Sequence, residues 1–272
     1  MGAQIVGVGT KVDTGFNADY ADLGAFSKSK NIPCHYFENI NAPESTKVIR
    51  ALEPGIIFCF GWNSLLKSEV LNIAPMGVLG HHPAPLPRNR GRHPLIWSIV
   101  LGLRESASTF FIMNEGVDSG KIVSQEAFAI RYEDTAADVY ERMTQTISRQ
   151  LERLVPDLIS GDYNAVSQNS SQSNVWRKRG LKDGEIDFRM HSEDIYNLVR
   201  GLSRPYVGAH IRRNDDLIKV WQTEEIDCDL PNIEPGKVID KSGITFTVKT
   251  LGGAVRIIDH EFGIVPSVGE YL

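Results

Sequence analysis

The sequence has few cysteines, no long apolar run and no excess of positive charge. Its three cysteines, Cys34, Cys59 and Cys228, lack the spacing of a metal site and are odd in number, so neither a metal centre nor a disulfide framework is expected. No apolar stretch approaches the roughly 20 residues that span a bilayer, and no signal peptide is visible. A net charge of -5 gives no general attraction to nucleic acid. These absences predict a cytoplasmic protein that binds no membrane.

Strand-like and helix-like segments alternate through the first half of the chain. With 272 residues and 42% hydrophobic composition, the chain can bury a sizeable core. Strands are expected at residues 3–8, 32–37, 55–60, 109–113 and 122–130, and helices at 18–30, 44–52, 95–103 and from a capping box at Thr135 and Asp138 to about Ser160. This alternation predicts an α/β fold with a mostly parallel sheet that is covered on both faces.

The rest of the chain has a different pattern. Residues 164–174 are rich in Ser, Asn and Gln and cannot bury apolar surface, which marks a domain boundary. A helix is expected from an N-cap at Ser192 to about Ser203, followed by short strands at 209–212, 217–221, 236–240, 245–250 and 255–260. We therefore expect a catalytic domain over 1–163, a linker over 164–175 and a small β-barrel-like domain over 176–272.

The segment 80–94 is the candidate site. Four prolines hold its backbone extended, and it follows an apolar run at 76–79 that is expected to end a strand. Loops at the carboxyl ends of parallel strands are where α/β proteins place their sites. If adjacent strands carry both loops, Asp118 could orient the imidazole of His82 and stabilise its protonated form. The alternative is that His82 is a surface histidine and Asp118 a turn former.

Two motifs within these loops resemble the paired signature of folate-dependent formyltransferases. They are Gly80-x-His82-Pro83-Ala84-Pro85-Leu86-Pro87-Arg88-Asn89-Arg90-Gly91 and Gly116-Val117-Asp118-Ser119-Gly120. In that family the first motif runs Asn-x-His-Pro-Ser-x-Leu-Pro-x-x-Arg-Gly and the second ends in Asp-(Ser or Thr)-Gly. Further similarity lies at 60–66, 176–179, 183–187 and 200–209. The chain looks most similar to the sugar N-formyltransferases of the family, which also contains methionyl-tRNA formyltransferase.

The resemblance implies a Rossmann-like domain followed by a small β-rich one, and transfer of a formyl group from the co-substrate N10-formyltetrahydrofolate to an amine. By resemblance, His82 is the base or the oxyanion partner, and Asp118 orients it and accepts the proton. The folate contacts implied are Leu86, Pro87, Gly116 and Val117, and the substrate contacts are Arg88, Arg90, Arg92 and Trp176. A nucleotide-linked amino sugar is the expected acceptor. The sequence leaves the oligomeric state open, and a homodimer is one possibility.

One departure concerns the chemistry. The family's asparagine two positions before the histidine is Gly80 here, so a side-chain oxyanion donor is missing. A backbone amide, a water or His81 could replace it, or activity could be reduced or lost. Ala84 also replaces a serine. The hypotheses are therefore a sugar N-formyltransferase, a methionyl-tRNA formyltransferase, or a non-catalytic relative that binds folate or nucleotide.

Several polar features also have a plain structural explanation. The arginines at 88, 90 and 92 could clamp a phosphate or could pair with carboxylates and fix the loop. Trp176 and the basic residues at 177–179 could hold a nucleotide or could be a solvated face. For the small C-terminal domain, acidic residues beside the basic ones make tRNA the less suitable partner.

The beginning of the chain differs from the family. Family members usually have an additional strand and helix before the segment that matches residues 3–8, and that strand lies between the strands matching 3–8 and 55–60. The resemblance thus implies a sheet without the usual first strand. Either residues 3–8 pair directly with 55–60, or the gap stays open and the natural chain begins upstream of Met1.

Overall fold

The protein, described here by a computed structural model, is built from two compact units. The structure describes residues 2–12, 20–62 and 64–272. The first unit contains Met1–Pro94, Ala107–Phe128 and Arg142–Trp176, and the second contains Leu95–Ser106, Ala129–Glu141 and Arg177–Leu272. The candidate site lies wholly within the first unit.

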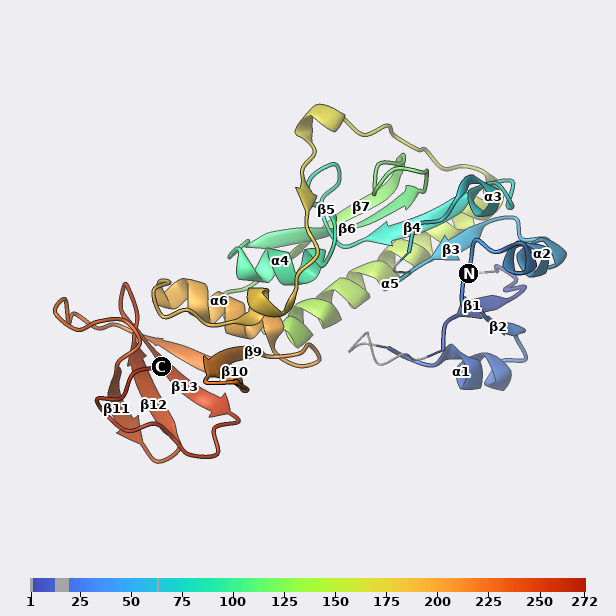
Figure 1. Ribbon diagram of the computed structural model, residues 1–272. Coiled ribbons are helices and arrows are strands. Elements are labelled where there is room, and N and C mark those ends of the chain that lie inside the picture. The colour runs from blue at the N-terminus through green and yellow to red at the C-terminus, as the bar shows by residue number, and fades with distance from the viewer. Residues whose placement is uncertain (1, 13–19, 63) are drawn as a thin grey trace. The chain divides into compact units, whose positions relative to one another are not determined.

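A four-stranded sheet forms the centre of the first unit (Figure 1). Its strand order is β3 (Ile57–Cys59), β4 (Val78–His82), β6 (Glu105–Ile112) and β7 (Ile122–Ala129). β3 and β4 are parallel, whereas β6 runs antiparallel to β4 with His82 opposite Thr109. The α/β fold predicted from the alternating pattern is confirmed.

The strand expected at residues 3–8 is displaced toward the C-terminus. β1 spans Val8–Thr10 and pairs in parallel with β2 (Cys34–Tyr36) in a separate two-stranded sheet. Within the described part of the chain, β1 is not paired with β3, and no other segment is hydrogen-bonded between the two. Of the two alternatives, direct pairing of the first strand with residues 55–60 is therefore wrong, and the gap between these strands is left open in the described chain.

Helices cover both faces of the four-stranded sheet. The helices of this unit are α1 (Leu23–Ser29), α2 (Pro43–Ala51), α3 (Ser68–Leu71) and, from Arg142 onward, α5 (Ala136–Ser160), with a 3-10 turn η1 at Ser170–Gln172. On one face Leu79 of β4 packs in a cluster with Leu154 and Leu158 of α5. On the other, Val78 packs in a cluster with Phe37 and Val70. Alternate residues of β4 are therefore buried on opposite sides, as expected for a central strand.

Two helix starts illustrate how local chemistry sets the boundaries. The Thr135 amide and hydroxyl both donate to Asp138 Oδ2, at 2.8 and 2.6 Å, so the predicted capping box and the helix that follows it are confirmed. The helix expected over 18–30 begins only at Leu23, where Asp22 Oδ1 accepts from the Gly24 amide at 2.9 Å. Part of that expected range, 18 and 19, lies outside the described residues.

The strand before the candidate loop is longer than the sequence predicted. Gly80, His81 and His82 belong to β4, because their backbone groups join the ladders with β3 and β6. The loop therefore begins at Pro83. Arg90–Gly91 then form a short strand, β5, that pairs in parallel with β8 (Val175–Trp176).

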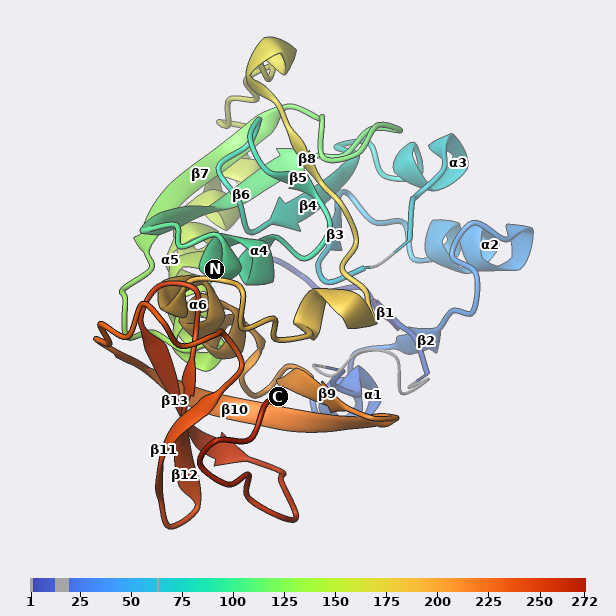
Figure 2. The same cartoon turned by 60° about the vertical axis from the view of Figure 1, so that its left-hand side comes forward.

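The second unit is an antiparallel sheet packed against helices (Figure 2). Its strands follow the order β11 (Val238–Ser242), β12 (Thr245–Lys249), β13 (Ala254–His260), β10 (Asp216–Ile226) and β9 (Ala209–Arg213), and its helical segments are α4 (Pro94–Val100), η2 (Leu181–Gly184) and α6 (Ser192–Leu202). Ile195, Leu198 and Ile257 lie in its core. The predicted β-rich part is confirmed as a sheet whose edge strands β11 and β9 are not paired to each other in the described chain.

The start of α6 is offset by one residue from the prediction. Ser192 is its first helical residue, and His191 occupies the N-cap position without a side-chain capping bond. The acidic residues expected in the first turn, Glu193 and Asp194, are in place. None of the helices in the described ranges is both long and apolar enough to cross a membrane.

Candidate active site

His82 and Asp118 lie together at the carboxyl end of β4. His82 is the last residue of the strand and is 5% exposed, and its Nδ1 lies 3.6 Å from Asp118 Oδ2. That separation is longer than the ~2.7–3.2 Å of a direct N–H···O hydrogen bond, so the contact is electrostatic. The two motifs that the sequence singled out are thus brought into one site.

The other ring nitrogen of His82 determines the tautomer. His82 Nε2 lies 2.8 Å from the backbone oxygen of Asn89. Because a carbonyl oxygen can only accept, Nε2 carries the hydrogen and donates it. In the neutral imidazole, Nδ1 therefore has a lone pair and faces the carboxylate of Asp118. This arrangement suits a base whose protonated form a neighbouring negative charge would stabilise.

A backbone amide holds the Asp118 carboxylate in place. The Gly91 N–H donates to Asp118 Oδ2 at 2.8 Å. Gly91 has φ +103, and a Cβ there would lie 2.3 Å from the Trp176 carbonyl oxygen, so a side chain is excluded by both conformation and space. The β5–β8 pairing thus presents the amide that anchors the carboxylate.

His81 points to the opposite face of the sheet from His82. Its Nε2 lies 2.9 Å from Ser108 Oγ, and its ring packs against Phe60 and Phe110. Burial, with a smaller contribution from the charge of nearby His82, lowers the pKa of His81 to about 4. His81 is therefore neutral at pH 7, and its side chain lies on the wrong face to stabilise an oxyanion beside His82.

Gly80 shares the face of His82, where a neighbouring side chain fills the available space. A Cβ at residue 80 would lie 2.8 Å from Met113 Cγ and 3.1 Å from Phe111 Cε1. Gly80 is not among the residues with positive φ in the described chain, so its backbone conformation does not require glycine. Steric crowding by Met113 is the structural reason for glycine at this position.

Polar side chains on β6 and β7 fix the loop that follows His82. Thr109 Oγ1 donates to the Ala84 carbonyl at 2.7 Å, and Gln125 Nε2 donates to the Leu86 carbonyl and to Thr109 Oγ1, both at 2.9 Å. Leu86 itself is only 3% exposed. Of the residues expected to contact folate, Leu86 thus has a buried side chain, Pro87 is half-buried, and Gly116 and Val117 are exposed beside Asp118.

The three loop arginines have different surroundings. Arg90 is buried, and its guanidinium donates to Gln168 Oε1. Arg88 is exposed and forms no ion pair with any residue that the structure describes. Arg92 is half-buried, and its backbone N–H donates to the carbonyl of Trp176 at 3.0 Å. Of the three, only Arg88 is exposed.

The basic run after Trp176 has a structural role within the second unit. Arg177 forms a two-bond pair with the carboxylate of Asp183, which holds the pKa of that carboxyl well below its usual range. Arg179 donates to the Asp183 carbonyl and lies 4.5 Å from the ring centroid of Trp97. These guanidinium groups are therefore already engaged by this unit.

The residues that support the His82 and Asp118 pair are not among those that the sequence predicted. The Asn89 carbonyl sets the His82 tautomer, and Asn174 Oδ1 accepts from the Asn89 amide at 2.8 Å. Gln168 contacts both Arg90 and the Asp118 loop. Asn174 and Gln168 lie in the polar segment that was expected to be a linker, whose composition gives no indication of a structural role.

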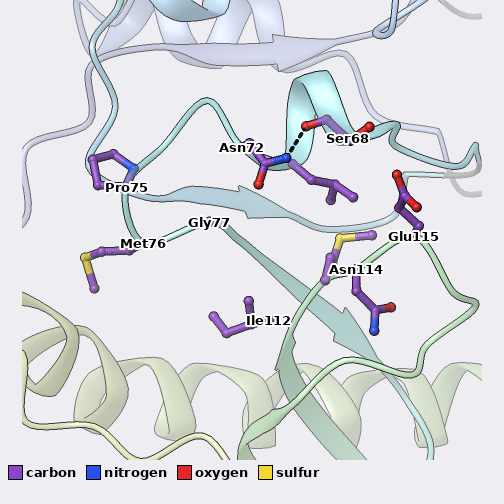
Figure 3. Close-up of a pocket in the computed structure, with 10 residues that line it drawn as sticks. Ser68, Asn72, Pro75, Met76, Gly77, Ile112, Asn114 and Glu115 are labelled. Atoms are coloured by element: carbon purple, nitrogen blue, oxygen red, sulfur yellow. Dashed lines mark hydrogen bonds between the residues drawn. The ribbon is translucent and has the colours of Figure 1, made fainter.

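A cavity of about 400 Å³ lies at the other end of β4 (Figure 3). The residues lining it are Ser68, Leu71, Asn72, Pro75, Met76, Gly77, Ile112, Met113, Asn114 and Glu115. Met76 and Gly77 precede β4, whereas His82 ends it. Neither His82 nor Asp118 lines the cavity, although Met113, Asn114 and Glu115 precede Asp118 in the same loop. Its relevance to the site is that it provides space next to Met113.

Solved structures with this fold include several formyl-transferring proteins. A sugar 3N-formyltransferase, WlaRD, crystallised with dTDP and 5-N-formyl-THF, matches with a TM-score of 0.68 and 20% identity over 94% of this chain and 87% of that one. Methionyl-tRNA formyltransferase from Clostridium thermocellum matches with a TM-score of 0.60 and 19% identity over 90% and 98%. At these identities the likeness concerns the fold.

A longer protein also matches. HypX from Aquifex aeolicus, in complex with tetrahydrofolic acid, gives a TM-score of 0.67 and 18% identity over 93% of this chain. The present chain covers 43% of HypX, so it spans less than half the length of that protein.

Family comparison matches both units. The formyl transferase model matches residues 21–155, and the model of the formyl transferase C-terminal domain matches residues 180–263. Together the two matches cover most of the chain, including both signature motifs and the paired His82 and Asp118. The chain belongs to the formyl transferase family.

Proposed function

We propose that this chain transfers a formyl group from N10-formyltetrahydrofolate to the amine of a nucleotide-linked amino sugar. The observation that carries the proposal is the arrangement of His82, whose Nε2–H donates to the Asn89 carbonyl while Nδ1 faces Asp118. An amine that attacks a formyl carbon must lose a proton, and a correctly placed base is worth roughly 10²–10⁴-fold in rate.

In this proposal His82 Nδ1 removes the proton from the attacking amine. The Asn89 carbonyl keeps the hydrogen on Nε2, so the lone pair stays on Nδ1. Asp118, held by the Gly91 amide, stabilises the imidazolium that results. As the bond between the formyl carbon and N10 of the folate breaks, the imidazolium returns the proton to N10, and tetrahydrofolate leaves. The amine has to bind in its unprotonated form, because an ammonium has no lone pair with which to attack.

The exposed surface beside Asp118 suits a folate. Val117 is 46% exposed and next to Asp118 in the chain, and Gly116 precedes it with an exposed backbone. Exposed apolar surface is what the flat rings of a pterin need for binding. Leu86 and Pro87 define the shape of the facing loop. Bound there, the folate would supply the formyl group.

Charge favours a nucleotide sugar over tRNA as acceptor. Arg88 gives the site loop an exposed guanidinium with no ion-pair partner in the described chain, which suits a phosphate. In the second unit, Arg177, Arg189 and Arg212 are paired with Asp183, Asp187 and Glu185. RNA binding depends on free cationic side chains that neutralise phosphates. These three guanidinium groups would have to leave their carboxylates to contribute to such binding.

The test incubates the chain with N10-formyltetrahydrofolate and a panel of nucleotide-linked amino sugars, with methionyl initiator tRNA in parallel. Mass spectrometry of the acceptors identifies the formylated product. We expect a nucleotide amino sugar to be formylated, and Arg88→Gln to raise the KM for that acceptor but not for folate. Lys121→Gln, an exposed change on the same unit, is the matched control and should leave both KM values unchanged.

Other results would overturn parts of the proposal. If only the tRNA is formylated, the acceptor is RNA and not a nucleotide-linked amino sugar. Folate binding without formylation of any acceptor would make the chain a non-catalytic relative, consistent with glycine at position 80.

A further inference from the structure

The Gln168 side chain lies between the two motifs of the candidate site. It belongs to the polar segment after α5 and is half-buried. Its Nε2 donates to the carbonyl oxygens of Asp118 and Gly120, at 2.8 and 2.7 Å. Its Oε1 accepts from Arg90 Nε and Nη2, at 3.2 and 2.6 Å. One side chain thus joins the loop after β4 to the loop after β6.

The hydrogen-bonding capacity of this amide is fully used. A glutamine amide has two N–H donors and an oxygen with two lone pairs, and all four are occupied here. The orientation of the amide is also unambiguous, because the guanidinium can only donate and the two carbonyls can only accept. Four hydrogen bonds of this kind fix the positions of the groups that Gln168 joins and also contribute to stability.

The residue that Gln168 fixes is in an unusual backbone conformation. Asp118 has φ +47, a left-handed conformation that is uncommon for a residue other than glycine. Its carboxylate is held by the Gly91 amide and its carbonyl by Gln168. We propose that Gln168 is a positioning residue, which orients the Asp118 carboxylate toward His82 and uses Arg90 as its own anchor.

This proposal changes the role expected for Arg90. Arg90 is 8% exposed, and its guanidinium donates two hydrogen bonds to Gln168. Arg90 therefore acts on Gln168 instead of on the substrate. Arg88 is the loop arginine with an exposed side chain.

The kinetic part of the test rests on the proposed formyl transfer. Gln168→Glu keeps the length of the side chain and the contact with Arg90 but removes both N–H donors, whereas Gln168→Met removes all four bonds. We expect each to lower kcat about 10-fold while the KM values change less than about 2-fold. Gln172→Met is the matched control, because Gln172 is exposed on the same segment. It should behave as the wild type.

A double-mutant cycle separates positioning from a general loss of structure. If Gln168 acts through Asp118, the Gln168→Glu change should cost less than about 2-fold in an Asp118→Asn background. An undiminished 10-fold loss in that background would overturn the proposal, as would a loss confined to KM.

A second measurement does not depend on activity. Exchange of the Gly91 amide hydrogen, which is bonded to Asp118 Oδ2, should accelerate about 10-fold or more in Gln168→Met. The Gly80 amide in the centre of the sheet is the internal reference and should keep its rate, as should Gly91 in Gln172→Met. Unchanged Gly91 exchange in Gln168→Met would refute the positioning role. If the wild type formylates no acceptor, the proposed function fails and this measurement still decides the role of Gln168.

Discussion

On β4, His81 and His82 are neighbours in the chain but face opposite sides of one sheet. His81 is enclosed by Phe60, Phe110 and the Ser108 hydroxyl, and burial lowers its pKa to about 4. His82 faces a carbonyl and a carboxylate. The same type of residue is therefore a neutral packing group on one face of the sheet, as His81, and a candidate base on the other, as His82.

The comparison shows that the partners of a histidine decide its role. A carboxylate beside Nδ1 stabilises the proton that a base must hold, whereas aromatic rings provide no such charge. Because successive residues of a strand alternate between faces, a shift of one position would exchange the two environments.

The largest effect is expected from replacing each of the two histidines by alanine and comparing the two variants. His82→Ala should lower turnover by roughly 10²–10⁴-fold, because the proposed base is lost, while the protein stays folded. His81→Ala should keep turnover within a few-fold and should instead lower the free energy of unfolding by about 1–3 kcal/mol, from a lost hydrogen bond and a cavity. Steady-state kinetics and urea unfolding on both variants check this. The reverse pattern would assign the base to His81.

A smaller loss should follow Asp118→Asn. An amide keeps the size of the carboxylate but not the charge that would stabilise a protonated His82, so we expect kcat to fall about 10- to 100-fold with little change in folate affinity. The Glu115→Gln variant, with an exposed carboxylate removed from the same loop, is the control. Near-normal turnover of Asp118→Asn would remove Asp118 from the mechanism.

Gly80→Asn probes the space on the His82 face. The new side chain would meet Met113, so we expect a loss of stability of about 1–3 kcal/mol by overpacking. Met113 also lines the cavity at the start of β4, which offers room for it to move. Because Met113→Ala removes the side chain that the new asparagine meets, adding it to Gly80→Asn should recover stability. If the amide then reaches the reacting centre, turnover rises; a double variant that is no more stable than Gly80→Asn would contradict the steric explanation.

A further effect concerns acid stability and the His81 face. The folded state has the pKa of His81 lowered from 6.5 to about 4, so the unfolded chain binds more protons between these values and stability falls as the pH drops through that window. Between pH 7 and pH 5 the loss amounts to roughly 2 kcal/mol. Urea unfolding at both pH values should show this loss reduced in His81→Asn and kept in His191→Gln. An equal loss in His81→Asn would place the acid sensitivity elsewhere.

Much of the architecture follows from local sequence. The Thr135 and Asp138 capping box marks the start of α5, and the five strands of the second unit lie where alternating short runs predicted them. The signature motifs also identified His82 and Asp118 before their distance was known. Local propensities and spacing suffice for such features because their causes lie within a few residues of one another.

Other features depended on contacts between distant segments. β4 extends to His82 because β3 and β6 provide hydrogen-bonding partners for its last residues. The proline-rich sequence that follows gives no indication of these partners. Gln168 and Asn174 were assigned to a linker by composition, yet they hold Arg90 and Asn89. A single sequence does not show which polar residues will meet across such separations.

Residue types and their spacing predicted an α/β fold that resembles the formyl transferase family, with a β-rich second part and a histidine and an aspartate in its two motifs. Tertiary structure alone decided which His82 nitrogen carries the hydrogen, why glycine occupies position 80, and that Gln168 joins the two loops. The physical reason is that hydrogen-bond direction and free volume are properties of groups brought together by folding, whereas a motif records only residue types and their spacing.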